Sequence, residues 1–232
     1  MHIIAFAGPS RPPGLDPAID WRPPAAAGDL LALMAEHPDR VVLIDGYFDA
    51  RPAPWHKEIL MLIEQGIPVI GAASMGALRA AELAAFGMIG IGRIFEAYHA
   101  GRLTADDEVA VLHAPAALGW RPLTEPLVNV RANLLGAVRV RAIDAAAARL
   151  YLDTARRLNF RDRTWDAICA APEFAHWLSA HRIDLKQRDA AQAIDFARTA
   201  PLPAPRARPT PRTSFLRRLA DHRGVTLPPV VS

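Results

Sequence analysis

A serine between an apolar run and a helix-forming segment is the residue in this chain best suited to nucleophilic chemistry. The segment Val69–Ala80 reads VIGAASMGALRA, so apolar residues lead into a cluster with almost no side chains. This order predicts a strand, a tight turn and a helix, with the Ser74 hydroxyl exposed near the first helical N–H groups. Small neighbours let the backbone bend sharply and let a substrate carbonyl approach. The pattern indicates a nucleophile, although Ala72 stands where a strict G-x-S-x-G elbow has its first glycine.

A structural role for Ser74 is the alternative interpretation. A serine between a strand and a helix often caps the helix, with its oxygen accepting from the second or third helical N–H. Ala77 stands three residues on, where a reciprocal capping box would carry Glu or Gln. A catalytic role therefore depends on whether a base can reach the hydroxyl.

Candidate bases lie at the start of the preceding helix, in Trp55–Glu58. In a right-handed βαβ unit this turn lies at the same sheet edge as Ser74. Adjacent helical residues point about 100° apart, so only one of His56 and Lys57 can face the serine. A histidine oriented by Asp45 would complete a Ser-His-Asp triad. A lysine would give a Ser-Lys dyad, which needs a desolvated amine with a lowered pKa.

Lysine is rare in this chain, and its rarity favours the dyad. Of 27 basic residues only Lys57 and Lys186 are lysine, and the rest are arginine. Arginine does not lose its proton in a protein, so a lysine base cannot be replaced by arginine. Lys186 lies in the polar run DLKQRD, which is typical of an exposed helix surface, whereas Lys57 has no such context. The backbone N–H of Met75, or those around Gly46, could receive the oxyanion.

Composition predicts a cytoplasmic protein with one sizeable domain, or a domain with an appendage. About half of the 232 residues are hydrophobic, which supplies a core, but no apolar run approaches the roughly 20 residues that span a bilayer. The one cysteine, Cys169, allows neither an internal disulfide nor a thiolate metal site. We expect no metal, no cofactor and no membrane association.

Charge divides unevenly along the chain. Residues 1–138 carry ten Lys/Arg against fifteen Asp/Glu, and residues 139–232 carry seventeen against nine. A basic half of this size can meet nucleic acid, an acidic protein or a nucleotide-bearing partner. The arginines are scattered among Ala and Leu without interleaved aromatics, so nucleic acid is not expected as a partner.

The first part of the chain has the pattern of an α/β protein. Apolar runs predict strands at 2–7, 41–44 and 68–71, and helical patterns with Pro and Gly boundaries predict helices at 29–36, 55–65 and 75–86. Alternating strands and helices indicate a small, mostly parallel sheet with flanking helices. Functional sites gather at the carboxyl ends of such strands, which here are residues 8–10, 45–47 and 72–74.

The second half of the chain is expected to be helical. Helices are predicted at 94–99, 129–142, 145–158, 165–170, 174–181 and 186–199, while 109–112 fits a strand or a helix. Residues 200–214 read as an extended, mobile linker rich in Pro and Arg. The expected organisation is an α/β core at 1–138, a helical extension at 139–199 and a Pro/Arg-rich tail at 200–232.

Several blocks in order resemble TfuA-like proteins, over Ile3 to about residue 135. The blocks are Asp45–Phe48, Trp55–Leu60, Gly71–Ala80, Phe86–Met88, Asp107–Ala110 and Pro126–Arg131. Within them the string ASMGA at 73–77 is also similar to the serine motif of Clp-type proteases.

The resemblance implies a function in peptide thioamidation. TfuA proteins accompany YcaO enzymes, which use ATP to activate a peptide amide, and the family is understood to release sulfide from a thiocarboxylated carrier protein of the ThiS type. Its site is hydrolase-like with a serine–lysine pair, which matches Ser74 and Lys57 here. A thiocarboxylate is anionic, so a cation must offset its charge, and Arg79 and Arg131 are the candidates.

Two other functions are open. The basic helical half and the proline-rich tail fit a non-catalytic adaptor that binds YcaO and raises its affinity for the peptide. Nucleotide binding at the sheet edge is disfavoured, because GMIGIG at 87–92 lacks the dinucleotide context and the chain has no Walker lysine. The sequence predicts no oligomeric state.

Overall fold

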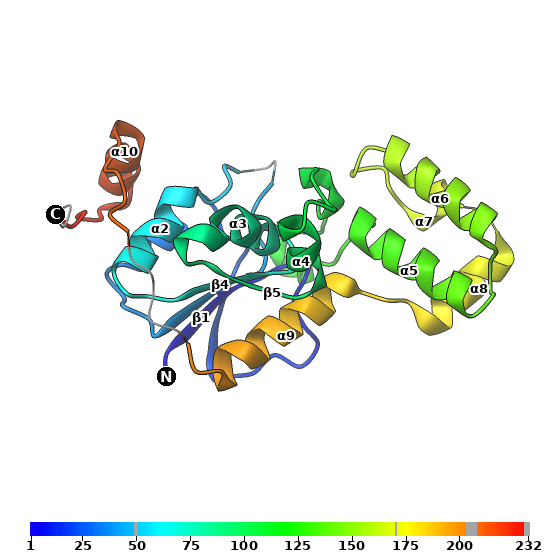
Figure 1. The fold of residues 1–232 in the computed structure, drawn as a ribbon, viewed down its shortest axis with the longest axis horizontal. Coiled ribbons are helices and arrows are strands. Elements are labelled where there is room, and N and C mark those ends of the chain that lie inside the picture. Colours follow the sequence, from blue (N-terminus) through cyan, green and yellow to red (C-terminus); the bar gives the residue numbers. More distant parts are fainter. Residues whose placement is uncertain (49–50, 170, 203–207, 230–232) are drawn as a thin grey trace.

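Five short strands form one parallel sheet in the computed structural model, which describes residues 1–48, 51–169, 171–202 and 208–229 (Figure 1). They are β1 (Ile3–Phe6), β2 (Ile19–Arg22), β3 (Arg40–Leu43), β4 (Val69–Ala72) and β5 (Ile89–Ile91), in the order β2-β1-β3-β4-β5. The α/β prediction with a parallel sheet is confirmed. β1, β3 and β4 coincide with the expected strands, whereas β2 and β5 were not expected.

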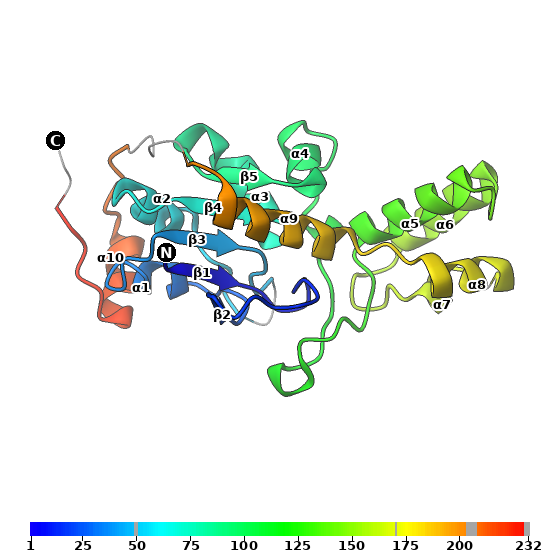
Figure 2. The same ribbon diagram turned by 90° about the horizontal axis from the view of Figure 1, so that it is seen from below.

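Helices cover both faces of the sheet because successive strand residues point to opposite sides. One face, which includes Ile4 and Val41, packs against α1 (Asp29–Ala32), α2 (His56–Glu64) and α3 (Met75–Leu83). The other face, which includes Ile3 and Val42, packs against α9 (Leu185–Thr199) through Ala190 and Ala193. Figure 2 shows α9 lying across the sheet. The sheet core therefore uses residues from both sides of the boundary expected at 138/139.

The strand order places a topological switch beside β1. From β1 the chain goes to β2 on one side, and it then returns by way of α1 to β3 on the other side. Ligand sites of open parallel sheets lie at the carboxyl ends of strands near such a switch. In this chain Pro9 follows β1, Gly46 follows β3 and Ser74 follows β4.

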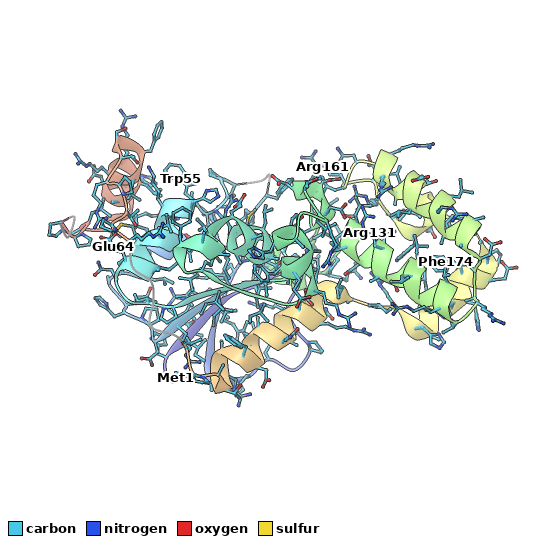
Figure 3. All side chains as sticks on the ribbon, viewed as in Figure 1. Met1, Trp55, Glu64, Arg131, Arg161 and Phe174 are labelled. Carbon is cyan, nitrogen blue, oxygen red and sulfur yellow. The ribbon has the colours of Figure 1, made fainter. Side chains whose placement is uncertain are left out.

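A lobe of four helices projects from one end of the sheet (Figures 1 and 2). The chain reaches it through α4 (Arg93–His99), and the lobe comprises α5 (Leu127–Arg139), α6 (Ala145–Arg157), α7 (Trp165–Ile168) and α8 (Pro172–His181). Its own apolar core is built around Phe174, labelled in Figure 3, which stacks on Trp177 with ring centroids 6.0 Å apart. These helices confirm the expected ones within a few residues, although Ala170 lies outside the described part.

Short 3-10 turns complete the described structure at Ala84–Phe86, Asp106–Glu108 and Ala116–Leu118. Residues 109–112, for which the sequence left strand and helix open, form neither. They follow the 3-10 turn at Asp106–Glu108 as irregular backbone and lie over the carboxyl edge of the sheet, where they help to line a cavity.

The end of the chain docks on the sheet core through a helix that the sequence analysis did not predict, α10 (Ser214–Arg223). Leu216 is fully buried in the cluster that contains α1 and α2. The described linker residues 208–213 are extended, but they are held in place: the guanidinium of Arg212 donates to both carboxylate oxygens of Glu64 at 2.8 Å. This segment of the expected linker is thus anchored to α2, residues 203–207 lie outside the described part, and the mobility of the linker stays a prediction.

Truncation of the α10 anchor tests this docking. Leu216→Ala removes a fully buried side chain, so we expect a loss of about 3 kcal/mol in the free energy of unfolding. The neighbouring Phe215 is 67% exposed, so Phe215→Ala is the matched control, with an expected loss below about 1 kcal/mol. Urea unfolding measures both. Equal effects of the two substitutions would show that α10 is not docked in solution.

A buried carboxylate joins the start of α2 to the loop before α1. Glu58 accepts hydrogen bonds from the backbone N–H groups of Gly28 at 2.7 Å, Leu31 at 3.3 Å and Trp55 at 2.9 Å. Burial raises the pKa of Glu58 to about 7 and outweighs these donors, which lower it. The folded protein thus binds this proton more tightly than the unfolded chain, where glutamate has a pKa of about 4.3.

This pKa gives the folding stability a pH dependence of known sign. The contribution of Glu58 is fully present below about pH 4 and is lost as the pH rises through about 7, by up to about 3 kcal/mol. Glu58→Gln cannot titrate, so we expect wild type to lose about 3 kcal/mol more than the variant between pH 4 and pH 8. Urea unfolding at the two pH values measures this. Parallel stability curves would contradict the assignment.

Candidate active site

The turn that carries Ser74 is a strained elbow between β4 and α3. The N–H of Ser74 donates to the carbonyl of Ala72 at 2.8 Å, and Ala73 between them has a φ of 65°. A hydrogen bond between residues two apart, with a positive φ at the residue between them, defines a tight three-residue turn. Residues other than glycine rarely adopt this conformation. Ala73 is fully buried, so the surrounding packing holds it there.

The Ser74 hydroxyl is not used for capping. Ser74 is the N-cap residue of α3, yet its side chain makes no capping hydrogen bond, and its Oγ forms no other hydrogen bond with the described residues. The residue is 8% exposed, so the hydroxyl is enclosed but unengaged. The structural alternative for this serine thus lacks the interaction that defines it.

Two glycines allow the first turn of α3 to press against the strands. A Cβ on Gly76 would lie 1.7 Å from the carbonyl oxygen of Leu43, and one on Gly71 would lie 2.2 Å from the carbonyl oxygen of Gly76. The N–H of Gly76 donates to the carbonyl of Ile44 at 3.2 Å. This close approach fixes Ser74 against the end of β3.

Ser74 lines a narrow cavity of about 40 Å³ at the carboxyl ends of β1, β3 and β4. Pro9 comes from the end of β1, Asp45 and Gly46 from the end of β3, and Met75 from the first turn of α3. The irregular segment 109–111 closes another side. A space of this size admits a thin chain end and excludes bulky side chains.

Two backbone donors at this cavity are unengaged. The N–H groups of Gly46 and Met75 have no hydrogen-bond acceptor in the described parts of the chain, and both residues line the cavity with Ser74. Met75 is the first residue of α3, where N–H groups have no intrahelical partner. The structure therefore places Ser74, predicted as the nucleophile, at one cavity with Gly46 and Met75, predicted as sources of the oxyanion donors, and these roles stay predictions.

Asp45 ties the ends of two strands together beside the cavity. Its Oδ2 accepts from the N–H groups of Gly8 and Ser10, both at 2.8 Å, and its Oδ1 accepts from the Ser10 hydroxyl at 2.7 Å. The carboxylate is 2% exposed, and all three donors come from the segment after β1.

The structure does not bring Lys57 to Ser74. The Lys57 ammonium donates to the Thr213 hydroxyl at 2.9 Å and lies in a separate surface hollow with Trp55 and Phe215. The side chain of His56 lies in the same hollow.

The triad alternative is not assembled either. The ring of His56 bonds to the carboxylate of Glu82 at 2.8 Å, while Asp45 is engaged by Gly8 and Ser10. His56 is exposed, and it does not line the cavity of Ser74.

The two arginines expected to offset substrate charge are engaged elsewhere. Arg79 donates to the carbonyl of Pro54 at 3.1 Å and pairs with Glu82 at 2.7 Å. Arg131 donates to the carboxylate of Glu108, with Nε 3.0 Å from Oε2. Neither lines the cavity of Ser74.

The other lysine of the chain is the one that is buried near the cavity. Lys186 is 3% exposed, so its interpretation as ordinary helix surface is wrong. Its ammonium donates to the carbonyl of Val109 at 2.9 Å, and Val109 lines the cavity of Ser74. A second small cavity, which Lys186 lines, shares Pro9 and Val111 with the first.

Burial lowers the pKa of Lys186, because desolvation disfavours the charged amine. The negative charges of Asp45 and Asp184 oppose this shift. Lys186 thus has the desolvated amine that a Ser-Lys dyad requires. Lysine is rare in this chain, and the argument that a rare lysine is kept because arginine cannot replace it holds for Lys186 as well as for Lys57.

Comparison with known protein families shows which family the chain belongs to. A model of the family described as TfuA-like protein matches residues 45–164, slightly more than half of the 232 residues. The chain belongs to the TfuA-like family. The matched span includes Asp45, Lys57 and Ser74 and ends before Lys186. A search of curated proteins gave no match.

In the part of the chain that the structure describes, no helix combines the length and apolar character needed to cross a bilayer. No group of three or more His, Cys, Asp or Glu side chains among these residues is placed to hold a metal ion.

A pair of alanine-to-glycine changes tests the strain at the elbow. Each removes one buried methyl, worth about 0.8 kcal/mol. Ala72→Gly in β4 adds a backbone entropy cost, so we expect a total loss of about 1.5 kcal/mol. Ala73→Gly relieves the positive φ, so we expect a change within about 0.5 kcal/mol of zero. Urea unfolding compares them, and an equal or larger loss at Ala73 would contradict a strained elbow.

Proposed function

We propose that this TfuA-like protein is a serine hydrolase that releases sulfide from the C-terminal thiocarboxylate of a ThiS-type carrier protein and supplies a YcaO enzyme in backbone thioamidation. The observation that carries the proposal is the unengaged Ser74 hydroxyl in a narrow cavity beside the free N–H groups of Gly46 and Met75. A glycine chain end has the small cross-section that this cavity admits. Family membership supports the choice of partner proteins.

The proposed reaction has two steps. Ser74 loses its proton to a base, and its Oγ forms a bond to the thiocarboxylate carbon, with the oxyanion held by the two N–H groups. The protonated base then gives this proton to the sulfur as the carbon–sulfur bond breaks, which releases hydrosulfide, restores the neutral base and leaves the carrier esterified to Ser74. Water attacks this ester with the same base, so the carrier leaves as a carboxylate and the serine regains its proton. The net reaction converts thiocarboxylate and water into carboxylate, hydrosulfide and a proton.

We assign the base to Lys186 in preference to Lys57. Lys186 is buried, has a lowered pKa and lies behind the segment 109–111 that borders the cavity of Ser74. One water molecule between the two small cavities would carry the proton from Ser74 to the amine. After this transfer the Lys186 ammonium offsets the negative charge of the oxyanion, a function for which Arg79 and Arg131 are not available.

A second candidate function is a non-catalytic adaptor that binds YcaO and raises its affinity for the peptide. The projecting lobe α5–α8 favours it, because this lobe presents helical surface away from the sheet (Figure 1). Removal of the Ser74 hydroxyl distinguishes the adaptor function from the hydrolase function. An adaptor keeps its effect on thioamidation when the hydroxyl is removed, whereas a hydrolase loses it when carrier-bound sulfur is the sole donor.

Matched lysine substitutions test the proposal. Purified protein is mixed with thiocarboxylated carrier and sulfide release is measured. We expect Ser74→Ala and Lys186→Met to lower the rate by at least about 100-fold, the range of a lost general base or more, and Lys57→Met to leave it within about threefold. Lys186→Arg keeps the charge and also abolishes release, because arginine cannot accept the proton.

The pH profile separates a base from a structural residue. With Lys186 as base, the rate rises with pH as the amine loses its proton, and the rise ends below the ordinary lysine pKa of about 10.4. Thermal unfolding of each variant shows whether it is folded. If Lys57→Met loses activity while a folded Lys186→Met keeps full activity, the base is Lys57 and not Lys186. If Ser74→Ala keeps full activity, the hydrolase proposal is wrong and the adaptor function remains.

A further inference from the structure

A second, larger hollow lies where the helical lobe meets the sheet core. It has a volume of about 440 Å³ and lies between α4, α5 and the start of α9. Figure 3 labels Arg131, one of its lining residues, on α5 at this junction. We call it the arginine groove. None of its lining residues lines the cavity of Ser74.

The arginine groove combines an apolar floor with a cationic rim. The floor is formed by Ile94, Ala97, Leu103, Val128, Ala132, Leu135, Ile183 and Leu185. The rim consists of Arg93, Arg102, Arg131, Arg139 and Arg188, and no acidic residue in the described part of the chain lines the groove. One of these apolar residues, Leu135, is 52% exposed, so its side chain is accessible to a partner.

Most of the rim charge is uncompensated within the described residues. Arg131 pairs with Glu108 and the charge of Arg93 interacts with the Asp189 carboxylate. The side chains of the other three arginines, Arg102, Arg139 and Arg188, form no ion pair or hydrogen bond there. Five guanidinium groups around a low-dielectric hollow raise the local positive potential and attract an anionic partner. Guanidinium groups also bind carboxylates in a two-pronged geometry.

We propose that the arginine groove binds an acidic amphipathic helix of a partner protein. Its apolar side chains, spaced i, i+3 or i+4 and i+7, would occupy the floor around Leu135, and its carboxylates would pair with the rim arginines. This inference does not rest on the chemistry at Ser74. The floor nevertheless shares an apolar cluster with the active-site helix, because Ile94 and Val128 pack with Met75 and Leu78.

The lining favours a peptide over a nucleotide or a nucleic acid. No aromatic side chain among the described residues lines the groove, so these residues offer no platform on which bases could stack. The N-terminus of α4, which a phosphate could otherwise use, is already capped: the N–H of Ile94 donates to the Asp189 carboxylate at 2.8 Å.

A designed peptide provides the probe. A fluorescein-labelled peptide of about 18 residues carries leucines in a helical stripe and glutamates elsewhere, and fluorescence anisotropy measures its binding to the full chain. The first control peptide has the same composition with the leucines out of register. The second has lysine in place of each glutamate. We expect the acidic amphipathic peptide to bind at least ten times more tightly than either control.

Charge reversal locates the binding surface. We expect Arg139→Glu and Arg188→Glu each to weaken binding at least tenfold, and Leu135→Glu to do the same. The matched control is Arg157→Glu on α6, an exposed arginine outside the groove, with an expected change below twofold. All four side chains are exposed, so these substitutions do not disturb the core. Thermal unfolding verifies that each variant is folded.

Several results would overturn the proposal. They are no binding of the peptide at millimolar protein, equal binding by the control peptides, or equal weakening by Arg157→Glu. Displacement of the bound peptide by ATP or by a single-stranded oligonucleotide, with loss of their binding in Arg139→Glu, would reassign the groove to a nucleotide or a nucleic acid.

Discussion

The carboxylate of Asp45 holds together the sheet edge on which the candidate active site depends. It gathers two N–H groups and one hydroxyl from the segment after β1, although it stands at the end of β3. β1 and β3 are the neighbours at which the strand order reverses, so this contact closes the chain around the switch point. The same negative charge acts on the buried amine of Lys186, which connects the scaffold to the proposed base.

The central strands and the elbow could be predicted because their signals are local. β1, β3 and β4 are continuous apolar runs buried on both faces, and small residues follow β4. The edge strand β2 contains Asp20 and Arg22 among prolines and has one buried residue, and β5 has a glycine at its centre. Both depend on hydrogen bonds to a neighbouring strand, which apolar periodicity does not reveal.

The proposed base could not be located from sequence because its partners are distant along the chain. Lys186 and Asp189 lie three residues apart, hence on one face of α9, and both are buried. The amine bonds to the carbonyl of Val109, and the carboxylate caps α4. Lys186 and Asp189 are thus the buried residues of a polar run that looks solvated, whereas Arg188 between them is exposed. By contrast, α10 had a local helix pattern in Leu216, Leu219 and Ala220 that the proline-rich context obscured.

After the helical lobe the chain comes back to the sheet as α9, and this helix has two structural roles. Its apolar face covers one side of the sheet, while its first turn lies between the arginine groove and the second small cavity, which shares Pro9 and Val111 with the cavity of Ser74. Leu185 lines the groove and Lys186 lines the cavity that adjoins the active site. A partner bound in the groove would therefore lie next to the helix end that carries the proposed base.

The most direct test of the central claim is to trap the carrier on Ser74. Thiocarboxylated carrier is mixed with the protein, quenched in acid within milliseconds to seconds, and analysed by intact-mass spectrometry and peptide mapping. The account predicts an ester between the carrier's terminal glycine and Ser74, with the mass of both proteins less hydrogen sulfide, and its absence in Ser74→Ala. Sulfide release without this adduct, or an adduct on another residue, would contradict it.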